Sequence, residues 1–327
     1  MDFTELPDLA AARLGGRALF ANDEFFASRH NLLKPGRGVF VPGKFTARGK
    51  WMDGWETRRR RTPGHDWCVV KLGLRGRIRG FDVDTNHFSG NQPEGCSLDA
   101  CDFRGPSTAR ALADAAWVLV MPQRPLGPSA RHLFEIAEDR PFTHVRLNIY
   151  PDGGIARLRV HGSVEADFTK ARGSIDLAAV QWGGVVLAVS DEHFGRRENL
   201  LMPGRAKDMG DGWETRRRRG PGHDWAIVRL GTSGLLQQVE IDTNHFKGNY
   251  PESAALDALH APGASSDDLI AAGSEWETIL PRTALKANRR HVFTKLASRG
   301  PWTHVRLRIF PDGGVSRLRI HGRPSEA

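Results

Sequence analysis

The clearest hydrophobic pattern in the chain is the alternation of apolar and polar residues in THVRLNIY, residues 143–150. Val145, Leu147 and Ile149 recur at every second position, which is the period of a strand with one buried face. The turn sequence PDGG follows, and a second alternating stretch comes after it, so the pattern predicts a β-hairpin. The same alternation places His144 on the outward, solvent-facing side of the first strand.

Similar signals occur elsewhere in the chain. WCVVKLG (67–73) and IRGFDVDT (78–85) are predicted as two short strands, the second leading into the polar loop NHFSGNQPE, and STARALADAA (107–116) is predicted as a helix. Many short strands separated by turn residues are typical of a β-sandwich. We expect a jelly roll, because that form protects the edges of its sheets.

Long segments of the sequence occur twice. DGWETRRRR begins at Asp53 and again at Asp211, and GHDW, DTNHF and PDGG follow each time in the same order. The period is far too long for a solenoid and indicates a tandem duplication of a whole domain. We therefore expect a first module of residues 1–168 and a second of residues 169–327. The first copy carries about ten extra residues between its opening, NLLKPGR, and the arginine run.

Composition is compatible with this organisation and narrows the class of protein. A chain of 327 residues suits about two domains of roughly 150 residues each. Apolar residues make up 39% and charged residues 26%, as in an ordinary globular protein. The net charge of +9 suits an anionic partner, whether a small carboxylate or a larger polyanion.

The expected location is the cytoplasm. Cys68, Cys96 and Cys101 do not recur in the second copy and lack metal-type spacing, which favours reduced thiols. The N-terminus shows no signal-peptide pattern. No apolar run approaches the roughly 20 residues needed to cross a bilayer.

Four consecutive arginines are typical of a nucleic-acid contact, but the context of this run argues against one. If the run is a strand, Arg58 and Arg60 face one side and the next two arginines face the other. The flanking acids would also repel phosphate, so we expect no nucleic-acid binding. Two interpretations stay open: ion pairs with Glu56 or Asp66, or the binding of a carboxylate by at least one arginine in each copy.

Each copy also carries histidines, aspartates and asparagines in polar loops at strand ends. They are His65, Asp66, Asp84, Asn86, His87 and Asn91, with the counterparts His223, Asp224, Asp242, Asn244, His245 and Asn249. Histidine and aspartate suit proton transfer near neutral pH, and asparagine suits an amide-like substrate. The alternatives are that the asparagines and Asp84 only cap turns, or that Asp84 and His87 bind a divalent cation.

With these motifs in view, the chain resembles the allantoicase family over nearly its whole length. The residues that carry the resemblance are DGWETRRRR, GHDW, DTNHFxGNxPE and THVRLxIxPDGGxxRLRxHG, each present twice. The resemblance implies an all-β chain of two tandem jelly-roll modules, similar to galactose-binding or discoidin-type domains, in a homo-oligomer. It also implies hydrolysis of allantoate to (S)-ureidoglycolate and urea in allantoin degradation, a part of purine catabolism. The expected partner is this small molecule, with no nucleic acid and no membrane. No cofactor is required on sequence grounds, although a divalent metal stays open.

This reaction suggests roles for the repeated polar residues. One arginine of a run would bind the substrate carboxylate, an acid–base pair would protonate the leaving urea and activate water, and amide-bearing side chains would hold the ureido groups. The predicted catalytic residues are Asp84, His87, Asp242, His245, His65 and His223. The predicted substrate-binding residues are Glu56, Arg58, Arg60, Asn86, Asn91, Glu214, Arg216, Arg218, Asn244 and Asn249, and no metal ligand is predicted.

The competing hypothesis is a non-catalytic module that binds a carbohydrate or a small anion. Jelly rolls often only bind sugars. Such a protein would present exposed aromatic residues on its loops, a role open to Trp55 and Trp67, although both also suit a core.

Overall fold

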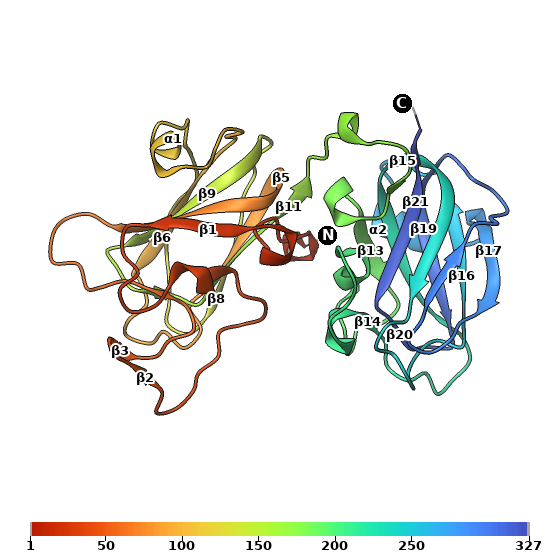
Figure 1. Ribbon diagram of the computed structural model, residues 1–327, viewed down its shortest axis with the longest axis horizontal. Coiled ribbons are helices and arrows are strands. Elements are labelled where there is room, and N and C mark those ends of the chain that lie inside the picture. The colour runs from red at the N-terminus through yellow and green to blue at the C-terminus, as the bar shows by residue number, and fades with distance from the viewer. Residues whose placement is uncertain (1, 326–327) are drawn as a thin grey trace. The chain divides into compact units, whose positions relative to one another are not determined.

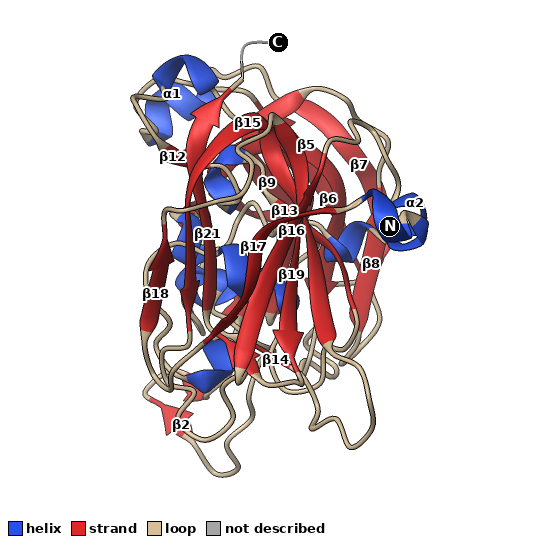
Figure 2. Ribbon diagram, turned by 90° about the vertical axis from the view of Figure 1, so that its right-hand side faces the viewer, coloured by secondary structure: helices blue, strands red, loops and turns tan. Residues whose placement is uncertain are grey.

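The computed structural model describes residues 2–325, apart from the side chain of Ser274. The chain forms two compact units, one from Asp2 to Glu165 and the other from Ala166 onward (Figure 1). Both are built almost wholly of strands joined by loops and short helices (Figure 2). The predicted module boundary after residue 168 falls within the short helix η4 (Phe168–Lys170). Within the described residues, no helix is long and apolar enough to cross a membrane.

The first repeat is a two-layered β-sandwich. Its strands are β1 (Arg17–Ala21), β2 (Phe45–Thr46), β3 (Gly49–Lys50), β4 (Trp55–Glu56), β5 (Asp66–Asp84), β6 (Gly95–Cys101), β7 (Val118–Pro125), β8 (Arg131–Glu135), β9 (Pro141–Tyr150), β10 (Gly154–Ile155) and β11 (Arg157–Val164). Its helices are η1 (Phe3–Glu5), η2 (Ala12–Leu14), η3 (Arg29–Leu33) and α1 (Ala109–Ala113). The helix predicted around α1 is therefore confirmed.

One long strand joins the two layers. The first half of β5 pairs with β1 and β9, and its second half pairs with β8 and β11. The segment therefore forms a single strand of 19 residues, and the prediction of two short strands is wrong. Its middle is crowded: a Cβ added at Gly76 would lie 2.4 Å from the carbonyl oxygen of Ser163, so only glycine fits where the two layers meet.

The second repeat has the same architecture. Its strands are β12 (Ile175–Asp176), β13 (Val185–Val189), β14 (Trp213–Glu214), β15 (Asp224–Asp242), β16 (Ser253–Leu259), β17 (Glu277–Ala284), β18 (Arg290–Phe293), β19 (Trp302–Phe310), β20 (Gly314–Val315) and β21 (Arg317–Pro324). Besides η4, its helices are η5 (Val180–Trp182), η6 (Arg197–Leu201), η7 (Met209–Asp211), α2 (Ser266–Ala271) and η8 (Gly273–Glu275). The structure thus confirms an all-β chain of two jelly-roll modules.

The PDGG turn does not close a hairpin. β9 and β11, which flank it, each pair with β5 and not with one another. Between them the short strand β10 pairs with β4. The arginine run follows β4 after one intervening residue, Thr57. The turn therefore carries the chain from one layer of the sandwich to the other, and it brings the run into contact with the turn itself.

Each repeat has its own hydrophobic core, and the outer face of its central strand is also covered. Val145, Leu147 and Ile149 are fully buried, as the alternation predicts. His144 is also buried, with 1% of its surface exposed, so its predicted outward and solvated position is wrong. The segment leading into α1 covers it, and the Ser107 hydroxyl lies 3.0 Å from its Nε2 atom.

Candidate functional site

The arginine run is not a strand. β4 ends at Glu56, and the arginines follow in backbone without regular secondary structure. Arg58 nevertheless pairs with Asp23, with an Nε–Oδ2 distance of 2.7 Å. Arg60 donates to the Asp66 carboxylate at 2.7 Å, one of the two ion pairs anticipated from the sequence.

The other two arginines of the run differ from these. Arg59 and Arg61 are exposed, and neither forms an ion pair or a side-chain hydrogen bond within the described structure. The second repeat matches: Arg216 pairs with Asp191 at 2.9 Å and Arg218 pairs with Asp224. The guanidinium groups predicted to bind a substrate carboxylate are thus already bound to aspartates.

Several motifs that are far apart in the sequence converge on the PDGG turn of the first repeat, residues 151–154, and on Tyr150, which precedes it. Glu56 pairs with Gly154 across β4 and β10, and the Asn91 carbonyl accepts from the Gly154 amide at 2.8 Å. The Arg60 amide donates to Asp152 at 2.8 Å.

Two further contacts complete this arrangement. The His65 ring packs on that of Tyr150, with centroids 4.9 Å apart, and the Asn91 side chain donates to Glu56 at 2.8 Å. We call Glu56, Arg60, His65 and Asn91, together with this turn, the turn cluster.

The second repeat reproduces the turn cluster contact by contact around residues 310–314. Glu214 pairs with Gly314 and accepts a hydrogen bond from the Asn249 side chain. The Arg218 amide donates to Asp312 at 2.7 Å, and the His223 ring lies 4.8 Å from that of Phe310. Half of the predicted residues therefore come together, in both repeats and in the same way.

Glu56 is the most chemically distinctive member of the turn cluster. Its side chain is half-buried, and the burial raises the pKa of its carboxyl, although the Asn91 hydrogen bond and the positive charge of Lys50 act in the opposite direction. A raised pKa lets a carboxyl hold its proton to higher pH, which suits it to act as a general acid. Its amide neighbour fixes its orientation.

His223 is driven toward its neutral form. Burial lowers the pKa of its imidazole, and the nearby positive charges of Arg308, Arg306 and Arg218 lower it further. A neutral imidazole can accept a proton, so His223 is chemically suited to act as a base.

The remaining predicted residues form a second group, the aspartate cluster, made of Arg37, Asp84, Asn86 and His87. Arg37 donates two hydrogen bonds to the buried Asp84 carboxylate, each 2.9 Å long, and the backbone amide of Asn86 donates a third. The Asn86 side chain donates to the Gly38 carbonyl at 2.8 Å.

His87 does not contact Asp84 in the described structure. It has left-handed backbone with φ of 66°, and its exposed ring packs against Phe40 with centroids 5.7 Å apart. The predicted acid–base pair is therefore not preassembled, and its role in catalysis stays a prediction. In the second repeat His245 is likewise separate from Asp242, and its Nε2 lies 2.9 Å from the Ala206 carbonyl oxygen.

Arg37 is the site residue that sequence reasoning missed. Its counterpart Arg205 lies 3.5 Å from the Asp242 carboxylate, so both repeats use this arginine in the same place. The signal was available in the repeated openings NLLKPGR and NLLMPGR, each of which ends in this residue.

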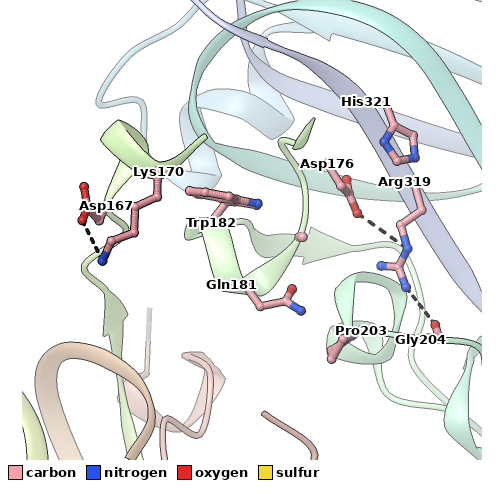
Figure 3. A pocket seen from close by; sticks show the side chains of 10 residues that line it. Asp167, Lys170, Asp176, Gln181, Trp182, Pro203, Gly204, Arg319 and His321 are labelled. Atoms are coloured by element: carbon pink, nitrogen blue, oxygen red, sulfur yellow. Dashed lines mark hydrogen bonds and ion pairs between the residues drawn. The ribbon is translucent and has the colours of Figure 1, made fainter. Parts of the chain in front are cut away.

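Other features of the described chain lie apart from both clusters. In residues 2–325, no three His, Cys, Asp or Glu side chains gather in a way that could hold a metal ion. A cavity of about 530 Å³ in the second repeat lies beside Trp182, Asp176, Arg319 and His321 (Figure 3). None of the predicted site residues lines it.

Comparison with known proteins agrees with the duplication. A family model described as an allantoicase repeat matches residues 7–165 and again residues 175–325. Probable allantoicase 2 of Burkholderia pseudomallei (strain K96243) is 49% identical over 96% of this chain and 94% of its own length. Probable allantoicase of Rhizobium meliloti (strain 1021) is 49% identical over 98% of this chain and 94% of its own.

A solved structure agrees as well. The crystal structure of allantoicase from Saccharomyces cerevisiae is similar with a TM-score of 0.82 and 36% sequence identity, over 97% of this chain and 92% of that chain. The duplicated motifs, the two matching jelly rolls and these relatives lead to one conclusion. The chain belongs to the allantoicase family.

Proposed function

We infer that this chain is an allantoicase, a hydrolase that converts allantoate and water into ureidoglycolate and urea in the degradation of allantoin. Relatives with that name match it at 47–49% identity over nearly the full length of both chains. The structural observation that carries the inference is the turn cluster. It places a half-buried carboxyl group, an amide and an imidazole around one turn, where four repeated motifs meet.

The chemistry requires a proton donor. The carbon that reacts bears a carboxylate and two ureido groups, and urea leaves poorly unless its nitrogen is protonated. We propose Glu56 for this step, since burial favours its protonated form. As the carbon–nitrogen bond breaks, the carboxyl proton passes to the ureido nitrogen. Water then supplies hydroxide to the carbon and returns a proton to the Glu56 carboxylate, so the reaction consumes one water and leaves the enzyme unchanged.

The other predicted residues keep proposed roles around this step. Asn91 holds Glu56 and is also placed to hold a ureido group. A substrate carboxylate at Arg58 or Arg60 would share the guanidinium with the aspartate already bound there. Asp84 and His87 would act as an acid–base pair only after a local rearrangement.

The proposal extends to the setting of the enzyme. We propose that it acts in the cytoplasm as a homo-oligomer, without binding nucleic acid or membrane. The three cysteines are free thiols buried in the first repeat, which suits a reducing compartment. The proton transfer proposed for Glu56 and water involves no metal, and we propose that no metal cofactor takes part. Full activity after treatment with a chelator would agree, and a loss restored by one divalent metal would contradict this part.

The decisive experiment is a urea-release assay with the purified full chain. Allantoate should yield urea, and allantoin should not. Glu56→Gln keeps the size and the hydrogen bond to Asn91 but removes the transferable proton, and it should lower kcat by about 100-fold or more. A thermal-shift screen with allantoate and simple sugars runs in parallel. If a sugar stabilises the protein and allantoate yields no urea, the hypothesis of a carbohydrate-binding module is favoured over that of an enzyme.

A further inference from the structure

The two repeats differ most in the connection that leads from the opening to the arginine run. Both connections start and end alike: the Val39 amide donates to Asp53 at 3.1 Å, and the Lys207 amide donates to Asp211 at 3.2 Å. Between these points the first repeat has ten more residues than the second. The extra chain forms a small hairpin, residues 40–51, in which β2 pairs with β3; it projects from the first repeat in Figure 1.

This hairpin links the turn cluster with the aspartate cluster. At one end Phe40 packs on His87, and the Lys50 ammonium lies over the Phe40 ring, 4.5 Å from its centroid. On its other side the hairpin contacts the segment next to Glu56: the Arg48 guanidinium donates to the Phe25 carbonyl at 2.9 Å, and the Phe26 amide donates to the Glu56 carbonyl at 3.2 Å. The positive charge of Lys50 also acts on the Glu56 carboxyl, although burial keeps the pKa of that carboxyl raised. One cation therefore lies within reach of both clusters.

Lys50 differs from the arginines around it in having no acid partner. Arg37, Arg58 and Arg60 each bind an aspartate. Lys50 is exposed, it forms no ion pair within the described structure, and its ammonium lies over the face of Phe40. A cation held over an aromatic ring keeps its charge and a defined position, while its N–H groups stay available to an anion. A small carboxylate can bind it without displacing anything.

The second repeat lacks this cation and differs elsewhere around its turn cluster. Tyr150, whose hydroxyl lies 2.9 Å from the Ser97 hydroxyl, is replaced by Phe310, and Ser97 is replaced by an alanine. The Arg282 guanidinium lies over the Phe310 ring, 4.3 Å from its centroid. Arg308 stands where the first repeat has an asparagine and donates to Asp257 at 2.8 Å.

We propose that hydrolysis takes place in the first repeat alone, with Lys50 of the hairpin binding the carboxylate of the substrate and Glu56 protonating the leaving urea. The second repeat keeps the turn cluster for its fold. This inference rests on the proposed function and adds to it which copy reacts and which cation recognises the substrate. Allantoate bound in this way places its charged end under the hairpin and its ureido groups toward Glu56 and Asn91.

The first test is a set of hairpin variants of the full chain, assayed by urea release across allantoate concentrations. Lys50→Met should raise KM by about 10- to 100-fold, the loss of one charge-assisted contact, with a smaller effect on kcat. Lys50→Arg should recover much of the affinity, because it restores the charge. Lys44→Met is the matched control, since Lys44 belongs to the same hairpin but lies over Trp51, and its KM should stay within about twofold of the parent.

The second test compares the two repeats directly. Glu56→Gln should lower kcat by about 100-fold or more, and Glu214→Gln, the same exchange in the second repeat, should lower it far less. Equal losses in both variants, or an unchanged KM in Lys50→Met, would overturn the inference while leaving the enzyme an allantoicase. Failure of the parent chain itself to release urea would instead remove the proposed function. Unchanged thermal unfolding of each variant excludes misfolding as the cause.

Discussion

Asp53→Asn should destabilise the first repeat strongly, although it barely changes the shape of the side chain. The Asp53 carboxylate is 5% exposed and accepts a hydrogen bond from Arg157, whose side chain is 4% exposed, over 2.5 Å. Lys34 reaches the same carboxylate at 2.9 Å, but that side chain is 47% exposed. The exchange leaves a buried guanidinium without its counter-charge.

The magnitude follows from burial. Removing one partner of a buried ion pair costs about 3–5 kcal/mol, whereas the exposed lysine contact is worth about 1 kcal/mol or less. For a domain of this size the loss corresponds to a Tm lower by roughly 6–20 °C. Burial tends to raise the pKa of Asp53, but hydrogen bonds from Arg157, Lys34 and the Val39 amide hold it below its usual value. The ion pair therefore stabilises the fold above about pH 4, the carboxyl's unfolded value, and is lost as the pH falls through its lower folded pKa.

Thermal unfolding followed by circular dichroism at pH 7 measures this effect. Asp139→Asn is the control, because Asp139 forms a similar pair with Arg79 but is 87% exposed, and its Tm should hardly change. Adding Arg157→Met to Asp53→Asn removes the stranded charge and should restore part of the lost stability. The reasoning is refuted if Asp53→Asn unfolds within about 2 °C of the parent, or if the double variant is less stable than Asp53→Asn alone.

Two further predictions concern buried groups of the first repeat. Burial, with the charge of Lys71, lowers the pKa of His144 to about 4, so its imidazole should stay neutral at pH 5 in an NMR titration, and titration near 6.5 would contradict this. The stability gained from the neutral ring is present above about pH 6.5 and is lost as the pH falls toward 4. Gly154→Ala should lower the Tm by several degrees, because a Cβ there would lie 1.9 Å from Phe88, whereas Gly220→Ala, with open space around it, should be neutral in the same scan.

The local elements of the fold were predictable, but their partners were not. The apolar residues of β9 show their period of two directly, and Val145, Leu147 and Ile149 are buried as that period predicts. The PDGG turn, however, has the same sequence signature whether it closes a hairpin or connects two layers. Its location depends on contacts such as that of the Thr57 amide with the Gly153 carbonyl, which join residues 96 positions apart. Burial of His144 likewise depends on a segment that no local pattern connects to it.

The candidate site was predictable as a set of motifs but not as a geometry. Repetition alone selected Glu56 and Asn91, and they prove to be in contact. It could not select the partner of Arg58, because any nearby carboxylate would satisfy a guanidinium, and Asp23 lies 35 residues away. Nor could it separate Glu56 from the other acids as a proton donor, since that property comes from burial, which only the folded chain reveals.

A motif that both repeats retain therefore indicates catalysis only where folding does not already explain its retention. Folding explains the retention of much of DGWETRRRR, in each copy alike. Its aspartate neutralises a buried arginine, and its threonine forms a hydrogen bond with the PDGG turn. Two of its arginines pair with aspartates. A duplicated domain must keep such contacts in order to fold, whether or not both copies react. Differences between the copies are free of that constraint. Lys50 in its hairpin and Tyr150 opposite His65 occur once, beside a cluster that occurs twice, and for that reason they point more directly to the reacting repeat than the motifs that are shared.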